Sequence, residues 1–285
     1  MIERVLVVGG GTMGRGIAQV VATAGMPVVV KEITRERAQK ALEGIQKGLQ
    51  RATASGKLSP VDMQAALARI RATDRLQDGA DAQLVIEAIV EDLETKKSVF
   101  RELDRLVSAD AILATNTSAL SITEIAGATS HPERVIGMHF FNPVPAMRLV
   151  EIIRGRDTAP HVVAAARAFA ERIGKTPVEV HEAPGFVVNR LLIPMINEAA
   201  YACMDGVAAR EDIDKAMVLG AGHPMGPLAL ADLIGIDIIV GILQTLEREF
   251  RNPKYRPCPL LQEMVRDGTL GRKTGRGFFS YERKG

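Results

Sequence analysis

The feature that most constrains the fold is a short apolar strand that runs directly into a glycine-rich turn. Residues 5–8 read VLVV, residues 9–14 read GGGTMG, and residues 15–23 can continue as a helix. In this G-x-G-x-x-G pattern the first glycine permits a tight turn, the second lets a phosphate approach the backbone, and the third allows close helix packing. The helix N-terminus adds oriented N–H donors. The motif predicts a dinucleotide site, rather than a tight turn without a ligand, built from Gly9, Gly11, Thr12, Met13 and Gly14.

An acidic residue stands where this type of fold places a ribose-binding residue. Glu32 follows a second apolar run, Val28–Lys31, at about the 20-residue interval expected after the glycines. Its negative charge would repel a 2′-phosphate, so the sequence favours NAD over NADP. Lys31 and Arg35 lie close enough in sequence to neutralise such a phosphate if they turn inward, which leaves NADP as the alternative.

Strand-like runs alternate with helical segments through the first 183 residues. The runs are Val5–Val8, Val28–Lys31, Leu84–Ala88, Ile112–Thr115, Val135–Met138 and Val178–Val180. This alternation predicts an α/β fold with a Rossmann-type, doubly wound, mostly parallel sheet. Apolar residues at helical spacing between residues 35 and 55, and a second helix opening at Pro60, predict a helical hairpin inserted in the sheet domain.

The strand signals stop near Pro184, and helical patterning continues to the end of the chain. Three segments are candidate helices: Phe186–Met204, Arg210–Leu219 and Leu228–Phe250. We therefore expect a dinucleotide-binding domain over residues 1–183 and an all-helical substrate and dimerisation domain over residues 184–285.

Composition and charge exclude several classes of protein. With 25% charged residues and a formal net charge of +2, the chain does not read as a nucleic-acid or membrane-surface binder. The longest apolar stretch, Leu228–Leu246, contains Asp232 and Asp237, so a buried or interface helix is expected rather than a membrane span. The absence of a signal-peptide pattern predicts a cytoplasmic protein. Cys203 and Cys258 are far apart and the five histidines lack metal-ligand spacing, so no metal site is expected.

A histidine and a glutamate in the segment Val135–Ile153 are the candidate acid–base pair. His139 lies near the carboxyl end of a short apolar strand, which Pro143 and Pro145 terminate. In open α/β sheets that edge borders the ligand crevice, where a histidine can take and return a proton. Glu151, on the strand that follows, can hydrogen-bond the other ring nitrogen and fix its tautomer. The alternative, a satisfied core histidine, is less favoured beside a cofactor motif.

Five further motifs follow the glycine turn in order. They are EAIVE at residues 87–91, NTS at 116–118, HFFNPVP at 139–145, PGFVVNR at 184–190 and GHPMGP at 222–227. With these motifs nearly the whole chain resembles the 3-hydroxyacyl-CoA dehydrogenase family. Its stand-alone length and its LIPMINEA segment look most like the bacterial 3-hydroxybutyryl-CoA dehydrogenases in that family.

The resemblance implies an NAD-dependent oxidoreductase that interconverts short-chain (S)-3-hydroxyacyl-CoA and 3-ketoacyl-CoA. His139 matches the family's general base, and Glu151 matches the glutamate that pairs with it. Ser118 and Asn189 match residues implied to hydrogen-bond the reacting oxygen or position the thioester. Read without the resemblance, the serine indicates turn chemistry and the asparagine a side chain that binds backbone. A homodimer through the helical domain is also implied.

Further residues match the cofactor and substrate cleft of the family. Glu91, Lys96 and Asn116 are implied at the cofactor, although a helix-start acid and a solvated lysine are the alternatives for the first two. The implied acyl-CoA contacts are Ser118, Arg51, Lys57, Asn142 and Asn189. Three positions depart from the family pattern: Glu32 replaces a common aspartate, Ala119 a serine, and Ser55 a lysine of the hairpin.

Two other functions stay open from the sequence. The motifs position a hydroxyl group more clearly than they define the rest of the substrate, so a longer or dicarboxylic 3-hydroxyacyl-CoA or a sugar acid is an alternative. A non-catalytic NAD-binding protein is a second alternative, which the complete set of His139, Glu151 and the glycine turn disfavours. The acyl length, the physiological direction and the pathway, whether butyrate metabolism or fatty-acid oxidation, also stay open.

Overall fold

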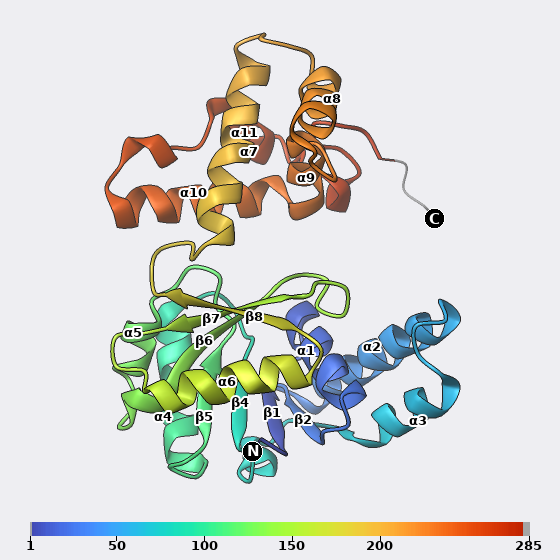
Figure 1. Cartoon of the computed structure of the whole chain (residues 1–285), viewed down its shortest axis with the longest axis vertical. Helices are drawn as coiled ribbons and strands as arrows, with labels where there is room; N and C mark the ends of the chain where they lie inside the picture. Colours follow the sequence, from blue (N-terminus) through green and yellow to red (C-terminus); the bar gives the residue numbers. More distant parts are fainter. Residues whose placement is uncertain (1, 282–285) are drawn as a thin grey trace. The chain divides into compact units, whose positions relative to one another are not determined.

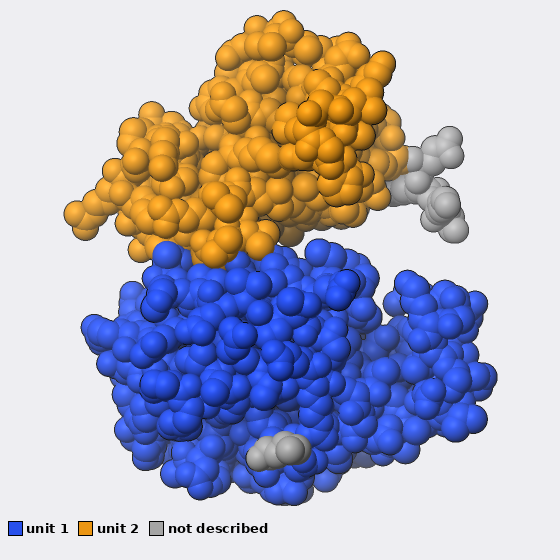
Figure 2. All heavy atoms as spheres, viewed as in Figure 1, with its two compact units in different colours: residues 1–183 blue, residues 184–285 orange. Residues whose placement is uncertain are grey.

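The computed structural model describes residues 2–281. It divides into two compact units, residues 1–183 and residues 184–285, which are coloured separately in Figure 2. Each unit has its own hydrophobic core.

The first unit is built on one eight-stranded sheet (Figure 1). Its strands are β1 Val5–Val8, β2 Val28–Lys31, β3 Ile70–Thr73, β4 Leu84–Glu87, β5 Ile112–Thr115, β6 Val135–Phe140, β7 Leu149–Arg154 and β8 Thr176–His181. The order across the sheet is β3-β2-β1-β4-β5-β6-β7-β8. All neighbours are parallel except β6 and β7. The predicted fold class is confirmed, while β3 is a strand that the sequence did not predict.

Helices cover the sheet. They are α1 Thr12–Thr23, α2 Arg35–Ala54, α3 Pro60–Ala68, α4 Leu93–Leu106, α5 Ile122–Ala126 and α6 Pro160–Arg172. The predicted hairpin is α2 with α3. The side chain of Thr34 accepts from the Arg37 amide at the start of α2, and Pro60 occupies the first turn of α3. Strand β1 is a continuous apolar run and is buried along its whole length. This is typical of a strand in a parallel sheet that helices cover on both faces.

The second unit is helical (Figure 1). Its helices are α7 Val188–Met204, α8 Arg210–Ala221, α9 Pro227–Ile234, α10 Ile236–Phe250 and α11 Pro259–Arg266. Short 3-10 helices cover residues 76–79 and 132–134 in the first unit and residues 253–255 and 272–274 in the second. The predicted start of α7 at Phe186 is two residues too early.

The prediction of one helix over Leu228–Phe250 is wrong. Gly235, with φ of +111°, separates α9 from α10, and the two helices are bent by 96°. A backbone with this φ is open to glycine and strained for other residues, so the helix ends there. Among residues 2–281, no single helix is long and apolar enough to span a membrane; α9 and α10 meet that criterion only as a bent pair.

The topology places the carboxyl ends of six strands at one edge of the sheet. They are β1, β2, β3, β4, β5 and β6, which run parallel to one another. Strand β7 runs antiparallel to β6, so it begins at this edge. Between β1 and β4 the strand order reverses, and open α/β sheets bind ligands outside the strands' carboxyl ends at such a point.

Candidate active site

His139 and Glu151 form a buried pair on neighbouring strands. His139 Nδ1 lies 2.8 Å from Glu151 Oε2, and the two residues are opposite each other in the β6–β7 register. His139 is 5% exposed and Glu151 is 1% exposed. The His139 ring also packs against the ring of Phe141, with centroids 4.5 Å apart.

This contact determines which ring nitrogen of His139 can act as a base. A carboxylate can only accept hydrogen bonds, so Nδ1 carries the proton and donates to Glu151. Nε2 of the neutral ring then keeps its lone pair. The pair has the arrangement in which an acidic residue orients an imidazole for proton transfer.

The glycine turn has the shape that a dinucleotide needs. Gly9 has φ of +104°, and a Cβ on it would lie 2.5 Å from the Ala88 carbonyl oxygen. A Cβ on Gly14 would lie 1.7 Å from the Gly9 carbonyl oxygen. A Cβ on Gly11 would meet nothing within 4 Å, which leaves open space beside the backbone where α1 begins at Thr12 and Met13. These residues fit a bound pyrophosphate at a helix N-terminus.

Glu32 is held against this turn. Its Oε1 accepts from the Gly10 amide at 2.8 Å, and its Oε2 accepts from the Ile33 amide at 3.0 Å. The carboxylate therefore stands at the end of β2, beside the glycines, where a ribose-binding acid is expected.

A second set of polar residues follows β4 and β5. Lys96 Nζ lies 2.6 Å from Glu87 Oε1 and 3.3 Å from Glu91 Oε2. Lys96 is 1% exposed, so the interpretation as a solvated lysine is wrong. The Ser118 amide donates to Glu91 Oε1 at 2.8 Å, and Asn116 Oδ1 accepts from the Phe140 amide at 2.9 Å. The loop after β5 is thus tied both to Glu91 and to the strand of His139.

Asn142 is exposed in the loop between β6 and β7. Lys175, itself 8% exposed, holds this loop by donating to the carbonyls of Val144 and Met147 at 2.5 and 2.8 Å. Burial lowers the pKa of Lys175. On the other side Val144 packs against α1, where a Cβ on Gly16 would lie 2.8 Å from the Val144 Cβ.

The remaining predicted substrate residues are Arg51, Lys57 and Asn189. Arg51, in the last turn of α2, and Lys57, after it, are exposed, and neither takes part in an ion pair within residues 2–281. Asn189 belongs to the second unit, as the second residue of α7. Its role beside His139 stays a prediction.

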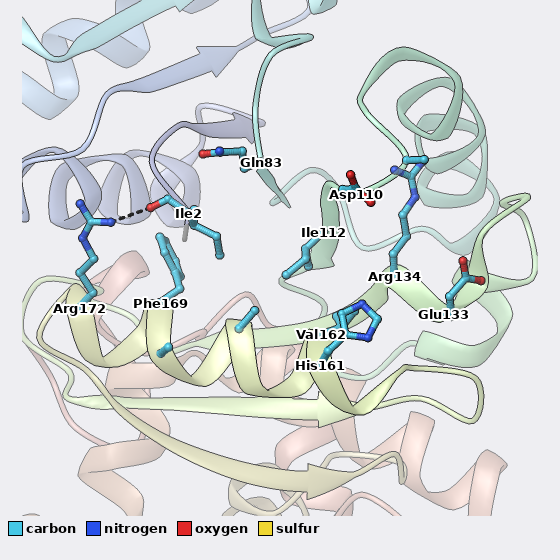
Figure 3. A pocket seen from close by; sticks show the side chains of 13 residues that line it. Ile2, Gln83, Asp110, Ile112, Glu133, Arg134, His161, Val162, Phe169 and Arg172 are labelled. Atoms are coloured by element: carbon cyan, nitrogen blue, oxygen red, sulfur yellow. Dashed lines mark hydrogen bonds between the residues drawn. The ribbon is translucent and has the colours of Figure 1, made fainter.

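A cavity of about 680 Å³ lies at the opposite edge of the sheet (Figure 3). Gln83, Asp110 and Glu133 line it, and they precede β4, β5 and β6 respectively. In Figure 3 a side-chain nitrogen of Arg172 donates to the Ile2 carbonyl, at 2.7 Å. None of the residues predicted for catalysis or cofactor binding lines this cavity, so the candidate site is the carboxyl edge and not the cavity.

Comparison of the sequence with models of known protein families identifies the family of this chain. Residues 4–183 match the 3-hydroxyacyl-CoA dehydrogenase, NAD binding domain, and residues 185–281 match the 3-hydroxyacyl-CoA dehydrogenase, C-terminal domain. The chain belongs to the 3-hydroxyacyl-CoA dehydrogenase family. The prediction of an enzyme of this family is confirmed, and the first domain agrees with a nicotinamide cofactor.

Individual members of the 3-hydroxyacyl-CoA dehydrogenase family are similar over their full length. The 3-hydroxybutyryl-CoA dehydrogenase of Clostridioides difficile is 50% identical over 280 residues, 98% of this chain and 100% of that protein. The probable 3-hydroxybutyryl-CoA dehydrogenase of Bacillus subtilis is 48% identical over 283 residues, 99% of each chain. The crystal structure of (S)-3-hydroxybutyryl-CoA dehydrogenase from Ralstonia eutropha has a TM-score of 0.96 and 46% identity, covering 99% and 100% of the two chains.

Sequence reasoning missed two polar residues at this edge. Glu87 is fully buried at the end of β4, and Thr117 Oγ1 donates to Glu91 Oε1 at 2.5 Å. A signal for Glu87 was available, because a lone acid closing the apolar run LVIE needs a buried partner. Nothing in the sequence distinguishes Thr117 from any other loop threonine.

Proposed function

We propose that this protein is an NAD-dependent (S)-3-hydroxybutyryl-CoA dehydrogenase, which interconverts the hydroxyacyl thioester and acetoacetyl-CoA. The observation that carries the proposal is the buried His139–Glu151 pair at the sheet edge that also holds the glycine turn. The names of full-length relatives at 47–50% identity support this substrate. A bound nicotinamide supplies the hydride acceptor or donor.

His139 acts as the general base. Its Nε2 takes the proton of the 3-hydroxyl group in the oxidation and returns it in the reduction. Glu151 keeps Nδ1 protonated beforehand and stabilises the imidazolium that forms, because its carboxylate is 2.8 Å away and shielded from water.

Ser118 and Asn189 orient the substrate oxygen. Hydrogen bonds aimed at an oxygen that gains negative charge stabilise it more in the transition state than in the ground state. Support for the serine is its place at the carboxyl edge, where the Ser118 amide is fixed by Glu91. Asn189 is proposed on the family motif alone.

Glu32 selects NAD over NADP. The Gly10 and Ile33 amides fix its carboxylate, so the negative charge cannot turn away from an added 2′-phosphate without losing those hydrogen bonds. Gly9, Gly11, Thr12, Met13 and Gly14 would hold the pyrophosphate. Glu91, Lys96 and Asn116 are proposed to bind the cofactor, and Arg51, Lys57 and Asn142 to contact the acyl-CoA.

Two further predictions accompany this activity. A homodimer formed through residues 184–285 is proposed from the family resemblance. A cytoplasmic location is proposed from the sequence.

The deciding experiment is the initial rate of NADH oxidation with acetoacetyl-CoA at neutral pH. NADPH and a longer 3-ketoacyl-CoA are run in parallel. We expect turnover with NADH that exceeds turnover with NADPH, and a higher kcat/KM for the four-carbon thioester. A higher kcat/KM for the longer thioester would transfer the proposal to a longer-chain dehydrogenase. Binding of NADH without turnover of either thioester would contradict the acyl-CoA assignment and favour a sugar acid or a non-catalytic role.

A further inference from the structure

Glu87 is a buried carboxylate that the proposed reaction does not use. It is the last residue of β4 and is 0% exposed. Its Oε1 accepts from Lys96 Nζ at 2.6 Å and from the Ile89 amide at 2.7 Å, and its Oε2 accepts from Thr115 Oγ1 at 2.7 Å. Burying an ion pair is costly, and apolar residues of similar volume are often as stabilising. The pair therefore indicates a role other than stability.

Lys96 joins Glu87 to a second carboxylate. Its ammonium, 1% exposed, contacts Glu87 Oε1 at 2.6 Å and Glu91 Oε2 at 3.3 Å. We call Glu87, Lys96 and Glu91 the acidic triad. Two carboxylates and one ammonium give the triad a formal charge of −1, with Glu87 and Lys96 buried and Glu91 43% exposed.

The acidic triad positions the loop that carries Ser118. Glu91 Oε1 accepts from the Ser118 amide at 2.8 Å, from the Ala119 amide at 3.3 Å and from Thr117 Oγ1 at 2.5 Å. A continuous set of contacts thus runs from Glu87 through Lys96 and Glu91 to Ser118.

The acidic triad also adjoins the glycine turn. The Ala88 amide, directly after Glu87, donates to the Val8 carbonyl at 2.8 Å. The Ala88 carbonyl oxygen would lie only 2.5 Å from a Cβ on Gly9. Glu87 is therefore at the point between β1 and β4 where an open α/β sheet takes its ligand.

We propose that Glu87 is a positioning residue that holds Lys96 and Glu91 in place and gives the cofactor site a net negative charge that favours the oxidised dinucleotide. The oxidised nicotinamide ring carries a positive charge and the reduced ring is neutral. A nearby negative charge therefore stabilises the bound oxidised form selectively. This inference rests on the proposed dinucleotide cofactor.

The test compares dissociation constants for NAD⁺ and NADH in the wild-type full chain and in Glu87→Gln. The amide keeps the size of the side chain and removes its charge. We expect the ratio Kd(NAD⁺)/Kd(NADH) to rise by a factor of about three to ten. Glu87→Asp, which keeps the charge, should leave the ratio within about twofold of wild type.

Thr115→Val is the matched control. It removes the hydrogen bond that Thr115 Oγ1 donates to Glu87 Oε2 and the one that it accepts from the Thr117 amide, and it changes no charge. It is expected to weaken both nucleotides by the same factor and leave the ratio unchanged. If Glu87→Gln does not fold, Glu91→Gln removes the same charge from a side chain that is 43% exposed, and the ratio should rise there too.

The outcomes separate this inference from the proposed function. Failure of the wild-type protein to bind NAD⁺ and NADH would overturn the cofactor assignment and the inference with it. Normal wild-type binding with an unchanged ratio in folded Glu87→Gln, or an equal rise of the ratio in Thr115→Val, would overturn only the role of Glu87.

Discussion

His139 and Glu151 are register partners across β6 and β7, with His139 Nδ1 2.8 Å from Glu151 Oε2. Among the strands that the structure describes, this is the antiparallel step in an otherwise parallel sheet. Directly opposed residues place their side chains on the same face of a sheet, and a slip of one residue would put them on opposite faces. The proposed base and its orienting acid therefore depend on the pairing of these two strands.

Replacing Glu151 with glutamine is expected to lower kcat by about two to four orders of magnitude. The amide can donate to Nδ1 and so favours the tautomer that has its proton on Nε2, which cannot act as a base. The measurement is the steady-state rate of (S)-3-hydroxybutyryl-CoA oxidation by NAD⁺, with NAD⁺ affinity measured separately and expected to be unchanged. Glu179→Gln, on an exposed residue of β8, is the control. A loss below tenfold in folded Glu151→Gln would contradict the role of the pair.

Glu32→Gln is expected to lower the preference for NADH over NADPH by about tenfold, because it removes the repulsion between a half-buried carboxylate and the 2′-phosphate, worth about 1.4 kcal/mol. The measured quantity is the ratio of kcat/KM for the two nucleotides. Glu36→Gln changes an acid of α2 that pairs with Lys40 on the surface, and it should leave the ratio unchanged. An unchanged ratio in Glu32→Gln as well would assign the preference to other residues.

Elements with a simple pattern could be predicted from the sequence. The buried strand β1 is apolar throughout, and β4 and β5 each begin with three apolar residues. Helix α2 places Ala38, Ala41, Ile45 and Leu49 on one buried face. Strand β3 has the sequence IRAT, in which one of the four residues is charged, so it contains no apolar run from which a strand could be predicted. The Gly235 break was missed because the apolar pattern continues on both sides of it.

Parts of the candidate site were predictable for a different reason. His139 and Glu151 lie on adjacent strands joined by a short turn, so their proximity follows from a local hairpin-like unit. Lys96 of helix α4 donates a hydrogen bond to Glu87 of strand β4, and Thr117, in the loop after β5, donates one to Glu91. Such contacts depend on how separate elements pack, which residue types alone do not reveal.

Gly235→Ala is expected to destabilise the second unit by about 1–3 kcal/mol, because a side chain is strained at φ of +111°. A Cβ there would also lie 3.1 Å from Asp237 Oδ1. The check is the midpoint of thermal unfolding. Gly241→Ala, within α10 and with nothing within 4 Å of the added Cβ, should hold or raise the midpoint through its better helix propensity. Equal midpoints for the two variants would contradict the strain at Gly235.

Asp104 is expected to contribute stability that is lost in acid. Burial alone raises the pKa of Asp104, but hydrogen bonds from Arg134, the Ser130 amide and His131 outweigh it and lower the pKa to about 2. Between about pH 2 and pH 4 the unfolded chain binds more protons here than the folded chain. The contribution, about 2 kcal/mol, is therefore complete above about pH 4 and lost as pH falls through 2.

Urea unfolding of wild type and Asp104→Asn between pH 6 and pH 2.5 would measure this contribution. The free energies of unfolding should differ most at pH 6 and converge in acid. A difference that stays constant with pH would show that the carboxylate's charge does not cause the stabilisation. Asp110→Asn, on an exposed acid with no ion pair among the described residues, is the control.

The hairpin of α2 and α3 is expected to bind the phosphates of CoA through Arg51 and Lys57, which are exposed and have no carboxylate partner within residues 2–281. Arg51→Ala and Lys57→Ala should each raise KM for acetoacetyl-CoA by about three- to tenfold and change kcat little, because a phosphate contact made equally in ground and transition states affects binding alone. The effect should shrink as ionic strength rises.

A truncated substrate separates phosphate binding from a general effect on the fold. Acetoacetyl-pantetheine lacks the phosphates of CoA, so its KM should be the same in wild type, Arg51→Ala and Lys57→Ala. Lys40→Ala, a cation of the same helix that pairs with Glu36 at 2.6 Å, should leave both KM values unchanged. A rise in KM for the truncated thioester that equals the rise for acetoacetyl-CoA would mean that the hairpin supports the fold of the site and does not contact the nucleotide end of the substrate.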